Sequence, residues 1–143
     1  MQKLPLLPPD TAVAEKQMSE RKKFQLEYQI NSSPEFLYTY ISTPSGLAEW
    51  FADDVRVDGD NYTFLWEGSE EKAKMLGKRA NKFAKFQWAG KPENEYFLFE
   101  IEKDELTGDV ALIVTDFEAP DEIKGATMIY NVSIDRLREI IGG

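Results

Sequence analysis

The stretch PDEIKGATMIYNVSIDRLREIIGG, residues 120–143, decides the fold. A proline and two acids open it, as at many helix starts, and two glycines follow its last apolar residue. Because Gly125 costs about 1 kcal/mol relative to alanine inside a helix, we expect the helix to start late, near Ala126. Apolar side chains recur at helical spacing and predict one face packed on a sheet: Ile123, Ala126, Tyr130, Ile134, Leu137 and Ile141.

Residues 55–117, which precede this helix, predict antiparallel strands joined mostly as sequential hairpins. Apolar and polar residues alternate over short stretches, which glycine-containing turns at 58–60 and 107–109 interrupt. Lys72–Lys85 is also compatible with a helix, since Lys and Ala favour helices. The expected strands are 55–57, 61–67, 72–77, 82–88, 95–102 and 110–117.

Residues 24–31 alternate in the same way and predict the first strand. Ser33-Pro34 and Thr43-Pro44 each place a capping hydroxyl before a proline, which predicts short helices over 34–42 and 44–51. We expect Leu47, Trp50 and Phe51 to pack onto the sheet. The predicted class is α+β, with a curved antiparallel sheet of about six to seven strands wrapped around the long C-terminal helix.

Residues 1–21 show no sustained period, and we expect them to be a mobile N-terminal extension or a start-site artefact. Residues 22–143 then form one domain, since a chain of 143 residues can bury roughly 68–70% of its unfolded surface. No apolar run approaches the roughly 20 residues of a membrane span, and prolines interrupt the apolar opening segment. We therefore expect a cytoplasmic protein without a membrane span.

The chain contains no cysteine and no histidine, so it lacks thiolate nucleophiles, disulfides and the commonest metal ligands. We expect no metal site and no cofactor. A net charge of -9 argues against nucleic-acid binding, which depends on Lys and Arg neutralising phosphates. The isolated glycines supply no phosphate-binding loop.

Residues 72–91 carry seven basic side chains and no acid. One interpretation is a solvated hairpin whose charges prevent edge-to-edge pairing. The other is a docking surface for an acidic protein partner, as in a co-chaperone-like module. The predicted partner-binding residues are Lys74, Lys78, Arg79, Lys82 and Lys85.

The acids Asp53, Asp54, Asp58 and Asp60 fit turn and cap positions, because their spacing differs from that of a calcium loop. Asp116 and Glu67 fall at predicted strand ends, where a carboxylate facing a cavity could act as an acid or base. A third hypothesis, a cofactor-free cyclase or dehydratase, is implied only by the family resemblance described next, and we assign no catalytic residue.

Five segments carry a resemblance to a known family: Ser33-Pro34-Glu35, residues 43–51, Trp66-Glu67-Gly68, Phe86-Gln87-Trp88 and Thr115-Asp116-Phe117. They resemble small bacterial START-like proteins of helix-grip fold, similar to bacterial homologues of the activator of the ninety-kilodalton heat-shock chaperone ATPase. The resemblance covers residues 22–143. It implies a cavity between the sheet and the terminal helix, which members of the superfamily use for lipids, sterols, hormones or aromatic polyketides. Likeness of fold does not transfer a ligand.

The leading hypothesis is non-enzymatic binding of a small apolar or amphipathic ligand in that cavity, by a monomer or weak homodimer. The same aromatic side chains could instead simply fill the core, and both interpretations stay open. Tyr28, Tyr40, Thr115 or Tyr130 could orient a polar end of the ligand. The predicted ligand-binding residues are Tyr40, Trp50, Trp66, Met75, Phe86, Trp88, Phe97, Phe99, Thr115, Met128 and Tyr130.

Overall fold

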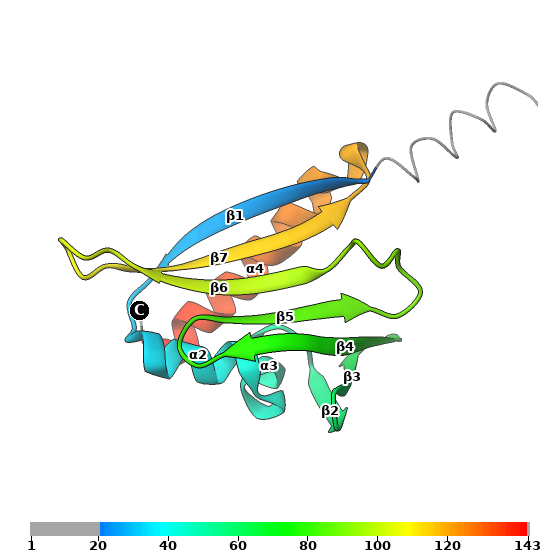
Figure 1. The fold of residues 1–143 in the computed structure, drawn as a ribbon, viewed down its shortest axis with the longest axis horizontal. Coiled ribbons are helices and arrows are strands. Elements are labelled where there is room, and N and C mark those ends of the chain that lie inside the picture. The colour runs from blue at the N-terminus through cyan, green and yellow to red at the C-terminus, as the bar shows by residue number, and fades with distance from the viewer. Residues whose placement is uncertain (1–20, 143) are drawn as a thin grey trace, which may run out of the picture.

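A seven-stranded antiparallel sheet dominates residues 21–142, the part of the chain that the computed structural model describes (Figure 1). The strand order is β1-β7-β6-β5-β4-β3-β2, so sequential hairpins build the sheet and only β1 pairs out of sequence, with β7. The predicted N-terminal extension lies outside the described residues, except for Arg21. The elements are β1 (Lys22–Ile30), α2 (Pro34–Ser42), α3 (Pro44–Trp50), β2 (Asp54–Asp58), β3 (Asn61–Trp66), β4 (Ser69–Arg79), β5 (Phe83–Trp88), β6 (Phe97–Lys103), β7 (Val110–Glu118), η1 (Pro120–Glu122) and α4 (Ile123–Ile141).

Helix α4 lies across one face of the curved sheet, as the helical spacing predicted (Figure 1). Tyr130, Ile134 and Leu137 are buried on its inner face. The expected late start near Ala126 is wrong, because α4 begins at Ile123 and includes Gly125. The 3₁₀ turn η1 leads directly into the helix, and packing outweighs the modest cost of one glycine. The α+β prediction is confirmed.

Helices α2 and α3 form as their caps predicted. The Ser33 hydroxyl accepts a hydrogen bond from the Phe36 N–H at 3.1 Å, and the Thr43 hydroxyl accepts one from the Gly46 N–H at 3.0 Å. A Cβ atom at Gly46 would lie 2.0 Å from the Thr39 carbonyl oxygen, so only glycine lets the two helices approach this closely. The chain thereby delivers Trp50 and Phe51 to the inner face of the sheet.

The strand predictions are confirmed with changed boundaries, and the helical alternative for Lys72–Lys85 is wrong. Strand β4 is longer than expected and continues to Arg79, with a bulge between Met75 and Gly77. Long-range pairing with β3 and β5 overrides the local helix preference of Lys and Ala. Among residues 21–142, no helix combines the length and apolar character that crossing a bilayer requires.

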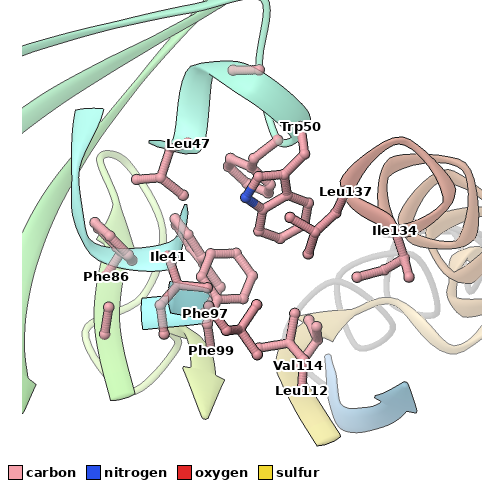
Figure 2. Packing of buried hydrophobic residues seen from close by; sticks show 14 of the residues in the cluster. Ile41, Leu47, Trp50, Phe86, Phe97, Phe99, Leu112, Val114, Ile134 and Leu137 are labelled. Atoms are coloured by element: carbon pink, nitrogen blue, oxygen red, sulfur yellow. The ribbon is translucent and has the colours of Figure 1, made fainter. Parts of the chain in front are cut away.

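Aromatic and aliphatic side chains together fill the space between the sheet and the helices (Figure 2). Ring centroids of Phe86 and Phe97 lie 4.9 Å apart, and those of Trp50 and Phe99 lie 5.3 Å apart. These four side chains are fully buried. Rings this close together are packed as densely as in an ordinary protein core. The protein's own side chains therefore occupy this part of the interior.

Candidate functional site

A hollow of about 210 Å³ lies at one end of the sheet, where β3, β5 and β7 end and β4 and β6 begin. Its walls combine the indole rings of Trp66 and Trp88, the phenol ring of Tyr96 and several charged side chains. The lining residues are Arg21, Trp66, Glu71, Trp88, Ala89, Lys91, Glu95, Tyr96, Asp116, Phe117 and Glu118. We call this polar hollow the mouth.

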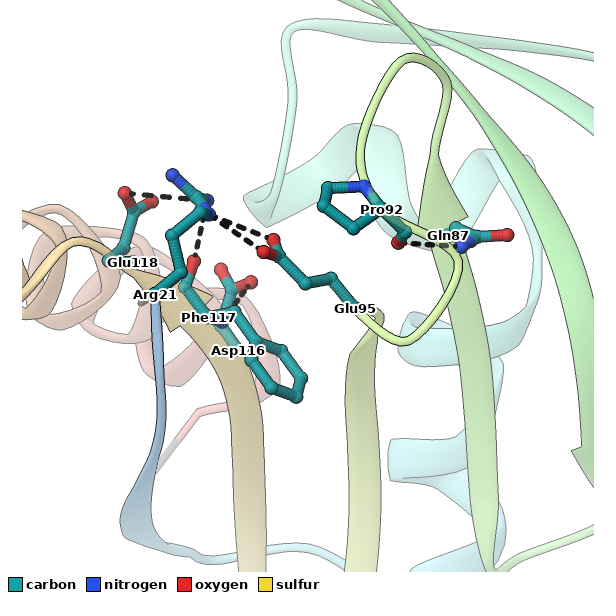
Figure 3. Close-up of polar contacts among 7 residues, drawn as sticks. All are labelled: Arg21, Gln87, Pro92, Glu95, Asp116, Phe117 and Glu118. Carbon is teal, nitrogen blue, oxygen red and sulfur yellow. Dashed lines mark hydrogen bonds and ion pairs between the residues drawn. The ribbon is translucent and has the colours of Figure 1, made fainter. Parts of the chain in front are cut away.

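Arg21 closes one side of the mouth by joining three segments of the chain (Figure 3). Its Nε donates to both carboxylate oxygens of Glu95 at 2.9 Å, and its Nη2 donates to the Phe117 carbonyl oxygen at 3.0 Å. Glu118 adds a longer ion pair at 3.9 Å. Glu95 is buried, so this charge-assisted contact is shielded from water and holds the strand ends in place.

Asp116 is the buried carboxylate of the mouth. One carboxylate oxygen accepts a hydrogen bond from the Tyr130 hydroxyl at 2.7 Å, and the other accepts one from the Phe117 N–H at 2.8 Å. Burial raises the pKa of Asp116, while these two hydrogen bonds and the charges of Arg21 and Lys91 oppose the shift. Burial and the neighbouring Asp116 charge raise the pKa of Tyr130 well above its ordinary value, so Tyr130 remains a donor.

A second, largely apolar groove of about 360 Å³ runs beside α4. Met128, Ile129 and Val132 are 61–70% exposed there, although apolar residues facing a core would be buried. Trp66 lines both this groove and the mouth, and its indole N–H donates to the Phe51 carbonyl oxygen at 2.9 Å. We call the groove residues Phe51, Asp53, Trp66, Met128, Ile129, Val132, Ser133 and Arg136 the α4 groove.

The structure divides the predicted ligand-binding residues into three groups. Trp66 and Trp88 line the mouth, Met128 lines the α4 groove, and Tyr130 bonds to the carboxylate of the mouth. Thr115 accepts a hydrogen bond from Gln25 on the opposite face of the sheet, since side chains alternate along β7. The remaining predicted residues lie in or against the aromatic core: Tyr40, Trp50, Met75, Phe86, Phe97 and Phe99.

The predicted partner-binding residues all lie on the β4–β5 hairpin. Lys74 is exposed within β4, Lys78 and Arg79 end that strand, and Lys82 lies in the turn. Lys85 points over the Tyr96 ring, with its Nζ 4.2 Å from the ring centroid. Of the four acids predicted for turns and caps, Asp53 accepts a hydrogen bond from the Glu67 N–H at 2.9 Å.

Sequence reasoning missed Arg21, Lys91, Glu95 and Glu118. Arg21 and Glu95 are 74 positions apart, and no local pattern signals a pair that only the sheet topology brings together. A weak signal existed at Asp116, because Thr115-Asp116 interrupts an otherwise apolar strand.

The family model of the START-like superfamily domain matches residues 18–143 of this chain. The match covers most of the sequence, and the chain belongs to that superfamily. No curated protein matches the chain.

Solved structures agree with this assignment. A Bacteroides fragilis protein solved by NMR is 34% identical, with 84% of this chain and 90% of that chain covered and a TM-score of 0.58. The Aha1 dimer from Colwellia psychrerythraea is 22% identical, with 84% and 96% covered and a TM-score of 0.71. DynU16, described as a protein in the dynemicin biosynthetic locus, is 12% identical, with 82% and 46% covered and a TM-score of 0.67. The last two likenesses show the fold alone.

Proposed function

We propose that this chain binds a small amphipathic ligand at the open end of its helix grip, without a chemical reaction. The observation that carries the proposal is the position of Trp66, which belongs to both the polar mouth and the apolar α4 groove. A ligand crossing Trp66 would bury an apolar portion on one side and satisfy a polar group on the other. Ligand sites combine apolar walls with a few polar groups in this way.

The apolar portion would lie on Met128, Ile129 and Val132. These side chains expose apolar surface that the core does not use, and covering it would contribute roughly 25 cal/mol per Å² removed from water. The groove volume of about 360 Å³ is within the range of known ligand pockets.

The polar portion would face Asp116. Four carboxylates and two cations line the mouth, and Glu95 already binds one of the cations, Arg21. The surplus of acceptors favours a ligand end that donates hydrogen bonds, such as an amine. The indole rings of Trp66 and Trp88 add a face suited to a cation.

The proposal is tested by titrating the protein with dodecylamine, dodecanol and dodecanoate below their micelle concentrations, with tryptophan fluorescence as the readout. We expect affinity to fall in that order. Asp116→Asn should weaken dodecylamine binding about tenfold and leave dodecanol unchanged. Glu105→Gln, in the exposed β6–β7 loop, removes the same charge and serves as the control.

Two results would oppose the proposal: no saturable binding of any of the three probes, or equal losses of affinity in Asp116→Asn and Glu105→Gln.

A second copy of the chain could also cover the α4 groove, since the Colwellia psychrerythraea relative is a dimer. Sedimentation of wild type and Val132→Glu over a concentration series distinguishes this case. A dimer that Val132→Glu dissociates would assign the groove to self-association.

The cyclase or dehydratase alternative concerns the same residues. Asp116 and Tyr130 form a buried acid and hydroxyl pair beside a hollow, which is the feature such chemistry requires. It predicts turnover of a bound compound, whereas the binding proposal predicts recovery of the ligand unchanged.

A further inference from the structure

The outer face of the sheet, opposite α4, carries a broad hollow of about 620 Å³. It lies over β2, β3 and β4 and extends to the loop after β5. Four cations line it, namely Arg56, Lys72, Lys74 and Lys91, together with the acids Asp58 and Glu93. We call this surface the outer basic groove.

Strand register explains why these cations share one face. Ala73 and Met75 are buried on the inner side of β4, so alternation directs Lys72 and Lys74 outward. Thr63 pairs with both Arg56 and Lys72, which places the two cations two strands apart, at about 10 Å. Asn61 and Gln87 flank Lys74 in the neighbouring row.

The four cations of the groove outnumber its two acids, Asp58 and Glu93, so its lining keeps a formal excess of two positive charges. The ion pairs between described residues include Arg56 with Asp54 at 3.9 Å, where both side chains are mostly exposed, and none of them involves Lys72, Lys74 or Lys91. Exposed pairs of this length contribute little. An anionic partner would be attracted by the excess positive charge of the groove.

We propose that the outer basic groove binds a short acidic segment of another protein. A concave hollow with amide and hydroxyl side chains, Asn61, Thr63 and Gln87, suits an extended peptide with carboxylates and backbone hydrogen-bonding groups. A long polyanion or a flat anionic membrane would also meet the rest of a chain whose net charge is -9, and would be repelled. Complementarity therefore favours a short charged segment.

The groove differs from the predicted partner-binding strip on the same hairpin. Of those five residues only Lys74 lies in the groove, while Lys78, Arg79 and Lys82 lie at the far end of β4 and in its turn. This division provides a matched control. The variants Lys72→Glu with Lys74→Glu, and Lys78→Glu with Arg79→Glu, change the net charge equally and alter exposed side chains only.

The experiment measures fluorescence anisotropy of a labelled peptide of about ten residues that alternates Glu and Ser. We expect saturable binding that weakens at least about tenfold between about 50 and about 200 mM salt. The groove variant should weaken binding about tenfold or more, and the hairpin-end variant about twofold or less. The affinity of the double variant Lys72→Gln with Lys74→Gln for the peptide should lie between those of wild type and the groove variant.

Three results would overturn the proposal: no saturable binding of the peptide, equal losses in the two charge-reversed variants, or tighter binding of a single-stranded oligonucleotide of the same charge. Thermal unfolding of each variant checks that the fold is retained. If the groove variant unfolds, the Gln variant decides the outcome, and a loss of less than about twofold in it would contradict the proposal.

Discussion

The aromatic interior and the mouth of the helix grip have opposite characters. Deep in the grip, Phe86, Phe97 and Phe99 are fully buried against one another, whereas at the mouth Trp66 and Trp88 line a hollow that contains charged groups. Aromatic residues of the same sheet therefore form core in one place and a solvent-facing wall a few residues away. The difference supports our proposal that a ligand binds at the mouth, because the aromatic interior is filled by the protein's own side chains.

Truncating the interior should give the largest effect. Phe97→Ala removes a fully buried ring that stacks on Phe86 and Trp88, and we expect it to cost about 3–5 kcal/mol of unfolding free energy. Urea unfolding provides the measurement. Trp88→Ala, at the partly exposed rim, should cost less. A cost below about 1 kcal/mol for Phe97→Ala would mean that the interior is not tightly filled.

The two faces of α4 offer the next comparison. Leu137 is fully buried, so Leu137→Ala should cost about 2–5 kcal/mol, while Val132→Ala in the α4 groove should stay within about 0.5 kcal/mol. The same unfolding measurement applies. Similar losses at both positions would show that the groove residues are packed, and the α4 groove would then not be available to a ligand.

Removing a hydroxyl at the mouth should have a smaller effect. Tyr130→Phe leaves the buried Asp116 carboxylate without one of its donors, at an expected cost of about 1–3 kcal/mol. Tyr28→Phe is the control, because Tyr28 donates to Asn131 in an exposed bond of 2.6 Å. Equal costs in the two variants would contradict the burial of the Asp116–Tyr130 pair.

The smallest predicted effect is a change in pH dependence. Folding raises the pKa of Asp116, mainly through burial, so the folded state binds the Asp116 proton more tightly than the unfolded state. Protonation of Asp116 therefore adds to the free energy of unfolding. This contribution is complete below about pH 4 and is lost as the pH rises through the folded-state pKa. Asp116→Asn cannot titrate, so its stability relative to wild type should increase with pH above about 4. Unfolding midpoints at several pH values test this, and a constant difference would contradict it.

Most of the fold could be predicted from the sequence because its signals are local. The alternation of apolar and polar residues predicted the strands, and Ser33-Pro34 and Thr43-Pro44 predicted the short helices. Apolar residues at helical spacing, including Tyr130 and Leu137, predicted α4. Less of the candidate site could be predicted from the sequence. Tyr130 and the indoles are visible as aromatic positions, but the partners of Asp116 and Arg21 come from segments that meet only once the sheet has formed.

The central claim is tested most directly by mapping amide and indole NMR signals during a dodecylamine titration. We predict that shifts concentrate at the indoles of Trp66 and Trp88, at Asp116 and along residues 128–133, while the amides of Phe86 and Phe99 stay unchanged. Shifts centred on Phe86, Phe97 and Phe99, with the mouth unaffected, would contradict it and would place the ligand inside the grip.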